Sequence, residues 1–261
     1  MTERRRDGPG STETVVSGRR AVLEAVRAGI AKRLLVVRGV RSTEGLRDVL
    51  SAAEEWAVPV RETERAELDR LAPDHRGVVA MVRIPRPIGE RELASWPFGD
   101  EDVVVVLDGI IDPQNLGAAA RSAEAAGAAM LVTRTRRSAD VTDAAIRASA
   151  GALIHLPHAR VANIARALAR LQEAGFTVVG LDERAGRTVF EQDRPTGRVA
   201  IALGSEGDGL ARLTRESCDV LVRLPMRGRV ASLNASASLA AALYAFVLPG
   251  RTEGSTPETT E

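Results

Sequence analysis

Three short stretches of this chain combine residue types that could bind a cofactor and move a proton. Each stretch directly follows an apolar run: residues 108–121 follow the run 103–107, residues 204–210 follow 199–203, and residues 225–238 follow 220–224. The runs are rich in β-branched residues, which is typical of strands buried on both faces of a parallel sheet. Ligands of such sheets bind beyond the carboxyl ends of the strands. We therefore expect the three stretches to face one cleft.

The first stretch offers an amide and a guanidinium. Asn115 could cap a helix, and Arg121 would then lie nearly two turns into that helix. Both side chains could be merely structural or solvated, or both could point into the cleft. Gly117 and the three alanines after it would let a bulky group approach the helix closely.

The second and third stretches offer small polar groups. The glycines from Gly204 to Gly209 are spaced G-x-x-G-x-G, which is not the dinucleotide-binding order. This segment is either a flexible turn or a cofactor loop. Ser232 and Asn234 stand where a final apolar helix begins, so that they could cap it or serve a site.

Two blocks of alternating helices and strands must position these residues. The first block, residues 15–83, predicts helices that Ser17 and Ser42 would cap, with short strands at 34–37, 58–60 and 78–82. Two prolines within 83–89 then indicate a stiff linker. The second block predicts strands at 103–107, 129–132, 176–181, 199–203 and 220–224 with helices between them. This repetition predicts an α/β fold with a parallel sheet.

Composition excludes several classes of protein. A single cysteine, Cys218, and three scattered histidines argue against a disulfide or a metal site, so no metal is expected. No apolar run reaches the roughly 20 residues that span a bilayer, and no signal-peptide core is seen, so we expect a cytoplasmic protein. Aromatic residues make up only 3% of the chain, so an RNA surface would depend on phosphate contacts and shape. Lys32 is the only lysine, and arginine is the better phosphate ligand of the two.

The three stretches together resemble the three sequence motifs of the SpoU (TrmH) family of RNA 2′-O-ribose methyltransferases, within the SPOUT superfamily. The resemblance rests on Asn115, Gly117 and Arg121, on Gly204-Ser-Glu-Gly-Asp-Gly, and on Leu224-Pro-Met followed by Ser232-Leu-Asn234. It covers about residues 103–247. Within the family, the chain most resembles the 23S rRNA guanosine-2′-O-methyltransferases of the peptidyl-transferase P loop.

Composition and resemblance together predict a domain plan. Residues 1–13 and 250–261 are rich in Gly, Ser, Thr, Pro and charge, which predicts disordered ends, with a linker at 84–100. The resemblance implies an L30e-like substrate-binding domain at 14–83 and a SPOUT methyltransferase domain at 101–249. It further implies a carboxy-terminal trefoil knot, S-adenosylmethionine as cofactor, 23S rRNA as partner, and a homodimer with residues 236–247 in its interface.

The resemblance also assigns roles to residues. The cofactor would be held mostly through backbone groups near Gly204, Leu224, Met226 and Leu233. The catalytic set would be Arg121, Asn115, Glu206, Ser232 and Asn234, with Glu206 orienting Arg121 or its helix. Similar enzymes are proposed to use the matching arginine as the base. Because an arginine pKa is about 12.5 or above, Arg121 could equally stay charged and stabilise the developing alkoxide.

Other substrates and one other class stay open at this point. The target could be the D-loop guanosine of tRNA, although such enzymes usually resemble a bare knotted domain. The chain could also be an antibiotic-resistance rRNA methyltransferase, which shares the two-domain plan. A non-catalytic RNA-binding protein is disfavoured because the five candidate catalytic residues are all present.

Overall fold

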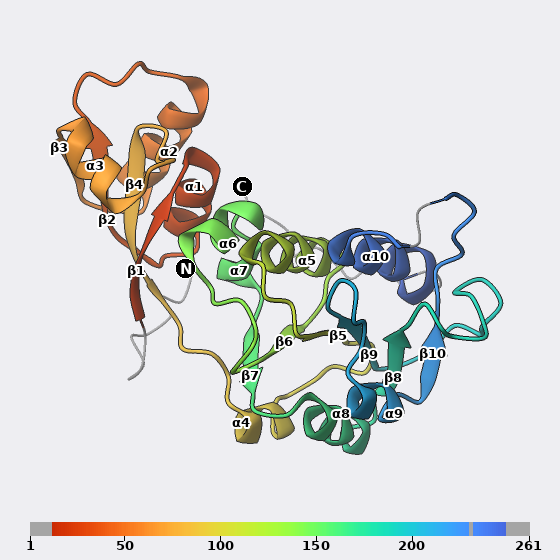
Figure 1. Cartoon of the computed structure of the whole chain (residues 1–261). Coiled ribbons are helices and arrows are strands. Elements are labelled where there is room, and N and C mark those ends of the chain that lie inside the picture. The colour runs from red at the N-terminus through yellow and green to blue at the C-terminus, as the bar shows by residue number, and fades with distance from the viewer. Residues whose placement is uncertain (1–11, 230–231, 249–261) are drawn as a thin grey trace. The chain divides into compact units, whose positions relative to one another are not determined.

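The computed structural model describes residues 12–229 and 232–248, which form two compact units (Figure 1). The first unit comprises the described residues up to Pro87, together with Asp112–Arg121 and Ala139–His155. The second comprises Ile88–Ile111, Ser122–Ser138 and the described residues from Leu156 onward. The predicted disordered ends, 1–13 and 250–261, lie outside the described residues except for 12 and 13. These two residues are the start of a strand, Thr12–Ser17, so the prediction is wrong for them.

The first unit contains a four-stranded mixed sheet with the order β1-β4-β2-β3. Strand β4 is antiparallel to both β1 and β2, whereas β2 and β3 are parallel. Along the chain its elements are β1 (Thr12–Ser17), α1 (Arg19–Arg27), β2 (Ala31–Val37), α2 (Glu44–Glu55), β3 (Val60–Thr63), α3 (Arg65–Leu71) and β4 (Val78–Ile84).

Alternation along the strands explains how this sheet is covered. Successive strand residues face opposite sides, so Leu35 and Val79 point one way and Leu34 points the other. Leu35 and Val79 pack with Leu68 of α3 and with Ala72. Leu34 is fully buried on the opposite face, and α1 contacts β1, β2 and β4 and packs against α2.

Both predicted serine caps in this unit are wrong. Ser17 is the last residue of β1, and Gly18 occupies the N-cap position of α1 with a φ of 82°. The second helix begins after Thr43 rather than Ser42, and no side chain caps it. Strand β1 itself was not predicted, because the polar residues before Val15 gave no apolar alternation.

The first unit also includes elements from the middle of the chain. These are α6 (Asp143–Ala148), α7 (Ala152–His155) and the part of α5 (Pro113–Ala125) up to Arg121. The unit is therefore discontinuous in sequence.

The second unit is a six-stranded sheet, parallel throughout, with the order β10-β8-β9-β5-β6-β7. Figure 1 shows α4, α8 and α9 on one face of this sheet and α10 on the other. The elements are α4 (Glu90–Ala94), β5 (Val103–Asp108), β6 (Met130–Arg134), β7 (His158–Val161), α8 (Ile164–Glu173), β8 (Thr177–Leu181), β9 (Val199–Gly204), α9 (Arg212–Glu216), β10 (Val220–Val222), α10 (Ala235–Ala242) and the π-helix η1 (Leu243–Val247).

The predicted α/β fold with a parallel sheet is confirmed, and five strands lie at the predicted runs. The short strand β7 was missed because it alternates polar and apolar residues over only four positions. The chain runs outward from β5 to β7 and then returns to the far side of β9. The trefoil knot stays a prediction.

The segment 84–100, for which the sequence predicts a linker, contains the short helix α4. Leu93 of this helix is 1% exposed and packs with Val104 and Val106 in the core of the second unit. Phe98 meets Phe176 edge-on, with ring centroids 4.8 Å apart. Much of this segment is therefore packed against the sheet.

The final apolar helix runs as predicted to Val247, with its last turn in π geometry. Across residues 12–229 and 232–248, no helix combines the length and apolar character needed to cross a bilayer.

Candidate functional site

The glycine-rich loop after β9 folds back onto its own strand. A Cβ on Gly204 would lie 1.9 Å from the carbonyl carbon of Gly209, so only glycine fits there. The amide of Gly209 donates to the carbonyl of Ser205 at 3.0 Å. Gly207 and Gly209 both have positive φ, at 89° and 69°, which side chains rarely adopt. The glycines thus produce one tight turn at the carboxyl end of β9.

Glu206, at the tip of this turn, is bonded to the start of α10. The Asn234 Nδ2 donates to Glu206 Oε1 at 2.6 Å, and the amide of Ala235 donates to the same oxygen at 3.3 Å. A carboxylate at a helix amino terminus also interacts favourably with the helix dipole. The second and third sequence motifs therefore meet in the structure.

Asn234 caps α10 as well. Its Oδ1 accepts from the amide of Ser236 at 2.9 Å and from the Ser236 hydroxyl at 2.6 Å. The capping interpretation is correct for Asn234 and not for Ser232. The side-chain oxygen of Asn234 caps the helix while its side-chain nitrogen binds Glu206.

A cavity of about 140 Å³ lies at the carboxyl ends of β8, β9 and β10. Its lining mixes aliphatic, carboxylate and arginine side chains with small polar groups. The lining residues are Leu181, Asp182, Glu183, Arg184, Leu203, Ser205, Glu206, Gly207, Gly209, Val222, Arg223, Leu224, Met226, Ser232, Leu233, Ala235 and Ser238.

Most of the predicted site residues of the second and third motifs line this cavity. Three of them are the residues proposed to hold a cofactor, Leu224, Met226 and Leu233. Glu206 and Ser232 line the cavity as well. Gly204 and Asn234 do not line it themselves. Gly204 lets the loop close beneath the cavity, and Asn234 holds Glu206 at its edge.

Asp182 and Arg223 also belong to the cavity, and the sequence interpretation did not single them out. Asp182 follows β8 and is 7% exposed. Its Oδ1 accepts from the amide of Arg184 at 2.8 Å, and Arg215 lies 3.7 Å from its Oδ2. Arg223 Nε donates to the carbonyl of Ala185 at 3.1 Å. The rule that ligands lie at strand ends could have found Asp182, since it directly follows an apolar run.

Asp108, the last residue of β5, anchors the neighbouring loops. Its side chain is 2% exposed, and Arg134 Nε lies 2.7 Å from Oδ1. Its Oδ2 accepts from the amide of Ala211 at 3.1 Å, just before α9. A buried carboxylate with both oxygens occupied in this way fixes the ends of β5 and β6 and the start of α9.

The first motif lies on α5, in the first unit. Asn115 does not cap this helix, contrary to the prediction. Asp112 does so, accepting from the amide of Gln114 at 3.0 Å, with Pro113 at the first helical position, where its missing N–H costs nothing. Asn115 lies inside the helix and is half-buried.

The group that approaches Gly117 closely is the neighbouring helix α6, so this glycine serves helix packing. A Cβ on Gly117 would lie 2.5 Å from the carbonyl oxygen of Ala145 and 2.5 Å from Ala148 Cβ. Arg121, one turn later, is exposed. The meeting of Asn115 and Arg121 with Glu206, Ser232 and Asn234 stays a prediction.

A polar and aliphatic cavity at the carboxyl edge of a parallel sheet is typical of the class of α/β proteins that bind a small-molecule ligand. Comparison with known proteins narrows the class. The SpoU rRNA methylase family model matches residues 102–244, and a model of RNA 2′-O-ribose methyltransferase substrate-binding domains matches residues 15–88. The chain belongs to the SpoU rRNA methylase family.

Individual relatives support this family assignment. A 23S rRNA (guanosine-2′-O-)-methyltransferase RlmB of Pseudomonas putida is 40% identical over 210 residues, covering 79% of this chain and 84% of the relative. An uncharacterized tRNA/rRNA methyltransferase of Mycolicibacterium vanbaalenii is 41% identical, covering 85% and 72%. The SpoU methyltransferase AviRb of Streptomyces viridochromogenes, solved with AdoMet, has a TM-score of 0.74 and 30% identity, covering 90% and 89%.

Proposed function

We propose that this protein transfers the methyl group of S-adenosylmethionine to the 2′-hydroxyl of a guanosine in 23S rRNA. The observation that carries the proposal is the cavity at the carboxyl ends of β8, β9 and β10, with the Glu206–Asn234 pair at its edge. The named activity of the P. putida relative supports the substrate, and the AdoMet complex of AviRb supports the cofactor.

The residues of the cavity fit such a cofactor. Leu224, Met226 and Leu233 offer an aliphatic surface to an adenine ring, and the carboxylates of Asp182 and Glu206 suit a cationic ligand. When bound, S-adenosylmethionine supplies an activated methyl group on a sulfonium. A Cβ on Gly207 would meet open space, so a ligand could approach the backbone of this turn closely.

The chain must also lower the barrier for a weakly acidic hydroxyl. The 2′-hydroxyl loses its proton as the new bond forms, so the site needs a group that accepts the proton or stabilises the developing negative charge. We assign this task to Arg121, either as the base or as a charged group close to the ribose oxygen. Asn115 and Ser232 would orient the ribose, and Glu206 would keep the start of α10 in place.

Two further features are part of the proposal. We expect a homodimer with α10 and η1 in its interface, and Tyr244, 53% exposed on η1, offers a large side chain for it. We also expect the protein to act in the cytoplasm, where bacterial ribosomal RNA is made. Light scattering across a dilution series would test the dimer.

The proposal is tested by mapping ribose methylation across rRNA and tRNA from cells with and without the gene. Loss of one methylated guanosine in 23S rRNA is expected, whereas loss of a tRNA site would overturn the assignment of substrate. In vitro, Arg121→Ala should lower turnover by about 10²-fold or more, and Arg121→Lys should rescue poorly. Arg194→Ala, which removes an exposed arginine, is the matched control. Near-normal methylation by Arg121→Ala would refute both roles of Arg121.

A further inference from the structure

A partly buried polar contact joins two parts of the first unit that lie 126 residues apart in sequence. The amide of Ser17 donates to Asp143 Oδ1 at 2.7 Å, and the Ser17 hydroxyl donates to Asp143 Oδ2 at 2.8 Å. Ser17 is fully buried at the end of β1, and Asp143 is the first residue of α6. Both carboxylate oxygens of Asp143 therefore accept hydrogen bonds from one residue of segment 15–88, which matches the substrate-binding family model and is called here the substrate-binding part.

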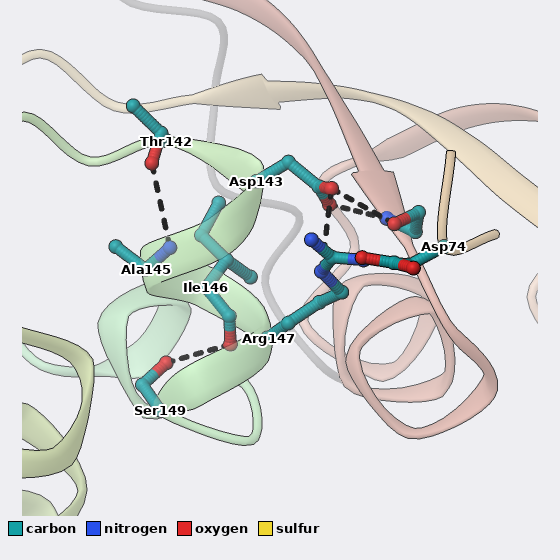
Figure 2. Close-up of polar contacts among 8 residues, drawn as sticks. Asp74, Thr142, Asp143, Ala145, Ile146, Arg147 and Ser149 are labelled. Carbon is teal, nitrogen blue, oxygen red and sulfur yellow. Dashed lines mark hydrogen bonds and ion pairs between the residues drawn. The ribbon is translucent and has the colours of Figure 1, made fainter. Parts of the chain in front are cut away.

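Arg147 extends this contact (Figure 2). One turn along α6, its Nε lies 3.4 Å from Asp143 Oδ2, and its Nη1 lies 3.1 Å from Asp74 Oδ2 in the loop before β4. Arg147 and Asp143 are 27% and 23% exposed, so water screens their pair only in part, whereas Asp74 is 77% exposed and its pair with Arg147 is screened more strongly. The side chains of Ser17, Asp74, Asp143 and Arg147, called here the latch, thus link the loop before β4 and the end of β1 to a single helix.

A second contact lies beside the latch. A Cβ on Gly151 would lie 2.7 Å from Glu24 Cβ of α1, and Gly151 has a φ of 97°, so glycine is required there. His155 Nε2 lies 3.3 Å from Glu24 Oε2. The turn between α6 and α7 therefore packs tightly against α1.

On its other side, α6 packs against the helix of the first motif. Gly117 of α5 approaches the carbonyl oxygen of Ala145 and the amide of Ser149 so closely that a Cβ would lie 2.5 Å and 2.8 Å from them. Thr142 accepts from the amide of Ala145 at 3.4 Å and so caps α6 (Figure 2). A continuous run of packed groups therefore leads from β1 through α6 to α5, the helix that carries Asn115 and Arg121.

We propose that Asp143 is a positioning residue, which holds the substrate-binding part in a fixed relation to the helix that carries Arg121. RNA held by residues 15–88 would then be presented to Arg121 in one geometry. The proposal rests on the proposed function, because it assigns a role in presenting the RNA substrate. Misplacement of reacting groups by about 1 Å can cost roughly 10² in rate, so loss of the latch should lower turnover.

The test compares Asp143→Ala with the wild type in methylation of a 23S rRNA fragment. We expect kcat per cofactor-binding site to fall at least 10-fold. The Kd for S-adenosylmethionine should change less than twofold, because the cavity lies wholly in the second unit. Counting sites by cofactor titration separates this result from simple loss of folded protein. Unchanged kcat per site would overturn the proposal.

Two more variants keep the test decisive if Asp143→Ala folds poorly. Asp143→Asn keeps one acceptor for Ser17 and loses the charge facing Arg147, so an intermediate loss of kcat is expected. Arg147→Gln leaves the Ser17 bonds intact and should have a smaller effect. Glu54→Ala, which removes an exposed carboxylate from α2, is the control. Equal kcat in all four variants would again overturn the proposal.

Hydrogen exchange gives a readout that does not depend on activity. In Asp143→Ala, the amides at the end of β1 and in α6 should exchange faster, while those of β5 and β9 stay unchanged. An inactive wild type with a normal exchange pattern would overturn the proposed function, and with it the role of Asp143. If the wild type is active and Asp143→Ala shows both normal hydrogen exchange and normal kcat, the role of Asp143 alone is overturned.

Discussion

The side-chain amide of Asn234 donates a 2.6 Å hydrogen bond to the carboxylate of Glu206, 28 residues earlier in the chain. The bond joins the turn after β9 to the start of α10, on two sides of the same cavity. Because one oxygen of Glu206 also accepts from the amide of Ala235, the carboxylate holds both a side chain and a helix end. This single group therefore fixes the rim of the cavity.

Replacing Glu206 should weaken cofactor binding. In Glu206→Ala, Asn234 Nδ2 and the Ala235 amide lose their acceptor, so the start of α10 is less well held. We expect the Kd for S-adenosylmethionine to rise about 10-fold, equivalent to about 1.4 kcal/mol, measured by calorimetry. Glu206→Gln keeps an acceptor oxygen and should have a smaller effect. Asp208→Ala, in the same turn, is the control, and an equal effect there would contradict the assignment.

Gly204 should tolerate no side chain. A methyl group there would overlap the backbone of Gly209, which cannot move without opening the turn. We expect Gly204→Ala to lower the free energy of unfolding by about 2 kcal/mol or more, measured by urea denaturation. Gly186→Ala places its methyl group in open space and should change that free energy by less than about 0.5 kcal/mol. Similar stability of the two variants would show that the turn adapts.

Long apolar runs were enough to predict the sheet of the second unit. The apolar runs 103–107 and 199–203 predict strands buried on both faces, and every residue of β5 and β9 is indeed buried. The rule that ligands lie at strand ends then directed attention to Glu206, which lines the cavity. These features depend on local patterns, which is why sequence alone reveals them.

The cap of α5 was assigned to the wrong residue although its signal is local: Asp112 directly precedes Pro113, which favours the first helical position, so Asp112 and not Asn115 caps the helix. Features that depend on tertiary contacts could not be predicted. Ser17 looks like a helix cap, yet its partner is Asp143. No local pattern marks a hydrogen bond between residues so far apart in sequence.

The Glu90 carboxylate should stabilise the second unit in a pH-dependent way. The Arg166 guanidinium, hydrogen-bonded to it, holds the pKa of Glu90 below its usual 4.5 despite burial, which acts the other way. Its contribution to the free energy of unfolding is therefore present above about pH 4.5 and is lost as pH falls through the lowered pKa. Glu90→Gln should be less stable than the wild type at pH 7, and urea denaturation should show the difference shrinking in acid.

The control for this prediction is Glu173→Gln, which removes an exposed carboxylate at the end of α8. Its free energy of unfolding should differ little from that of the wild type, both at pH 7 and in acid. If the difference in free energy of unfolding between Glu90→Gln and the wild type stayed constant down to pH 3, the assigned ion pair would be contradicted.

The single cysteine should be inert in the folded protein. Burial, reinforced by the nearby charges of Asp219, Asp182 and Asp108, raises the pKa of Cys218 to about 12. Because the thiolate is the reactive form, a disulfide reagent at pH 8 should label Cys218 slowly in the native state and rapidly in urea. Rapid stoichiometric labelling of the native protein would show that the thiol is accessible and ionised.

The discontinuous first unit bears on how pieces of such enzymes can be recombined. A chimaera that exchanged only residues 15–88 between two relatives would transplant Ser17 and Asp74 but leave behind Asp143 and Arg147. The contact between these residues would then combine side chains from two different parents: a hydroxyl and a carboxylate from one, and a carboxylate and a guanidinium from the other. We expect grafts that also carry residues 139–155 to retain a compatible junction, so RNA specificity would be exchanged most cleanly along the boundary of the compact unit.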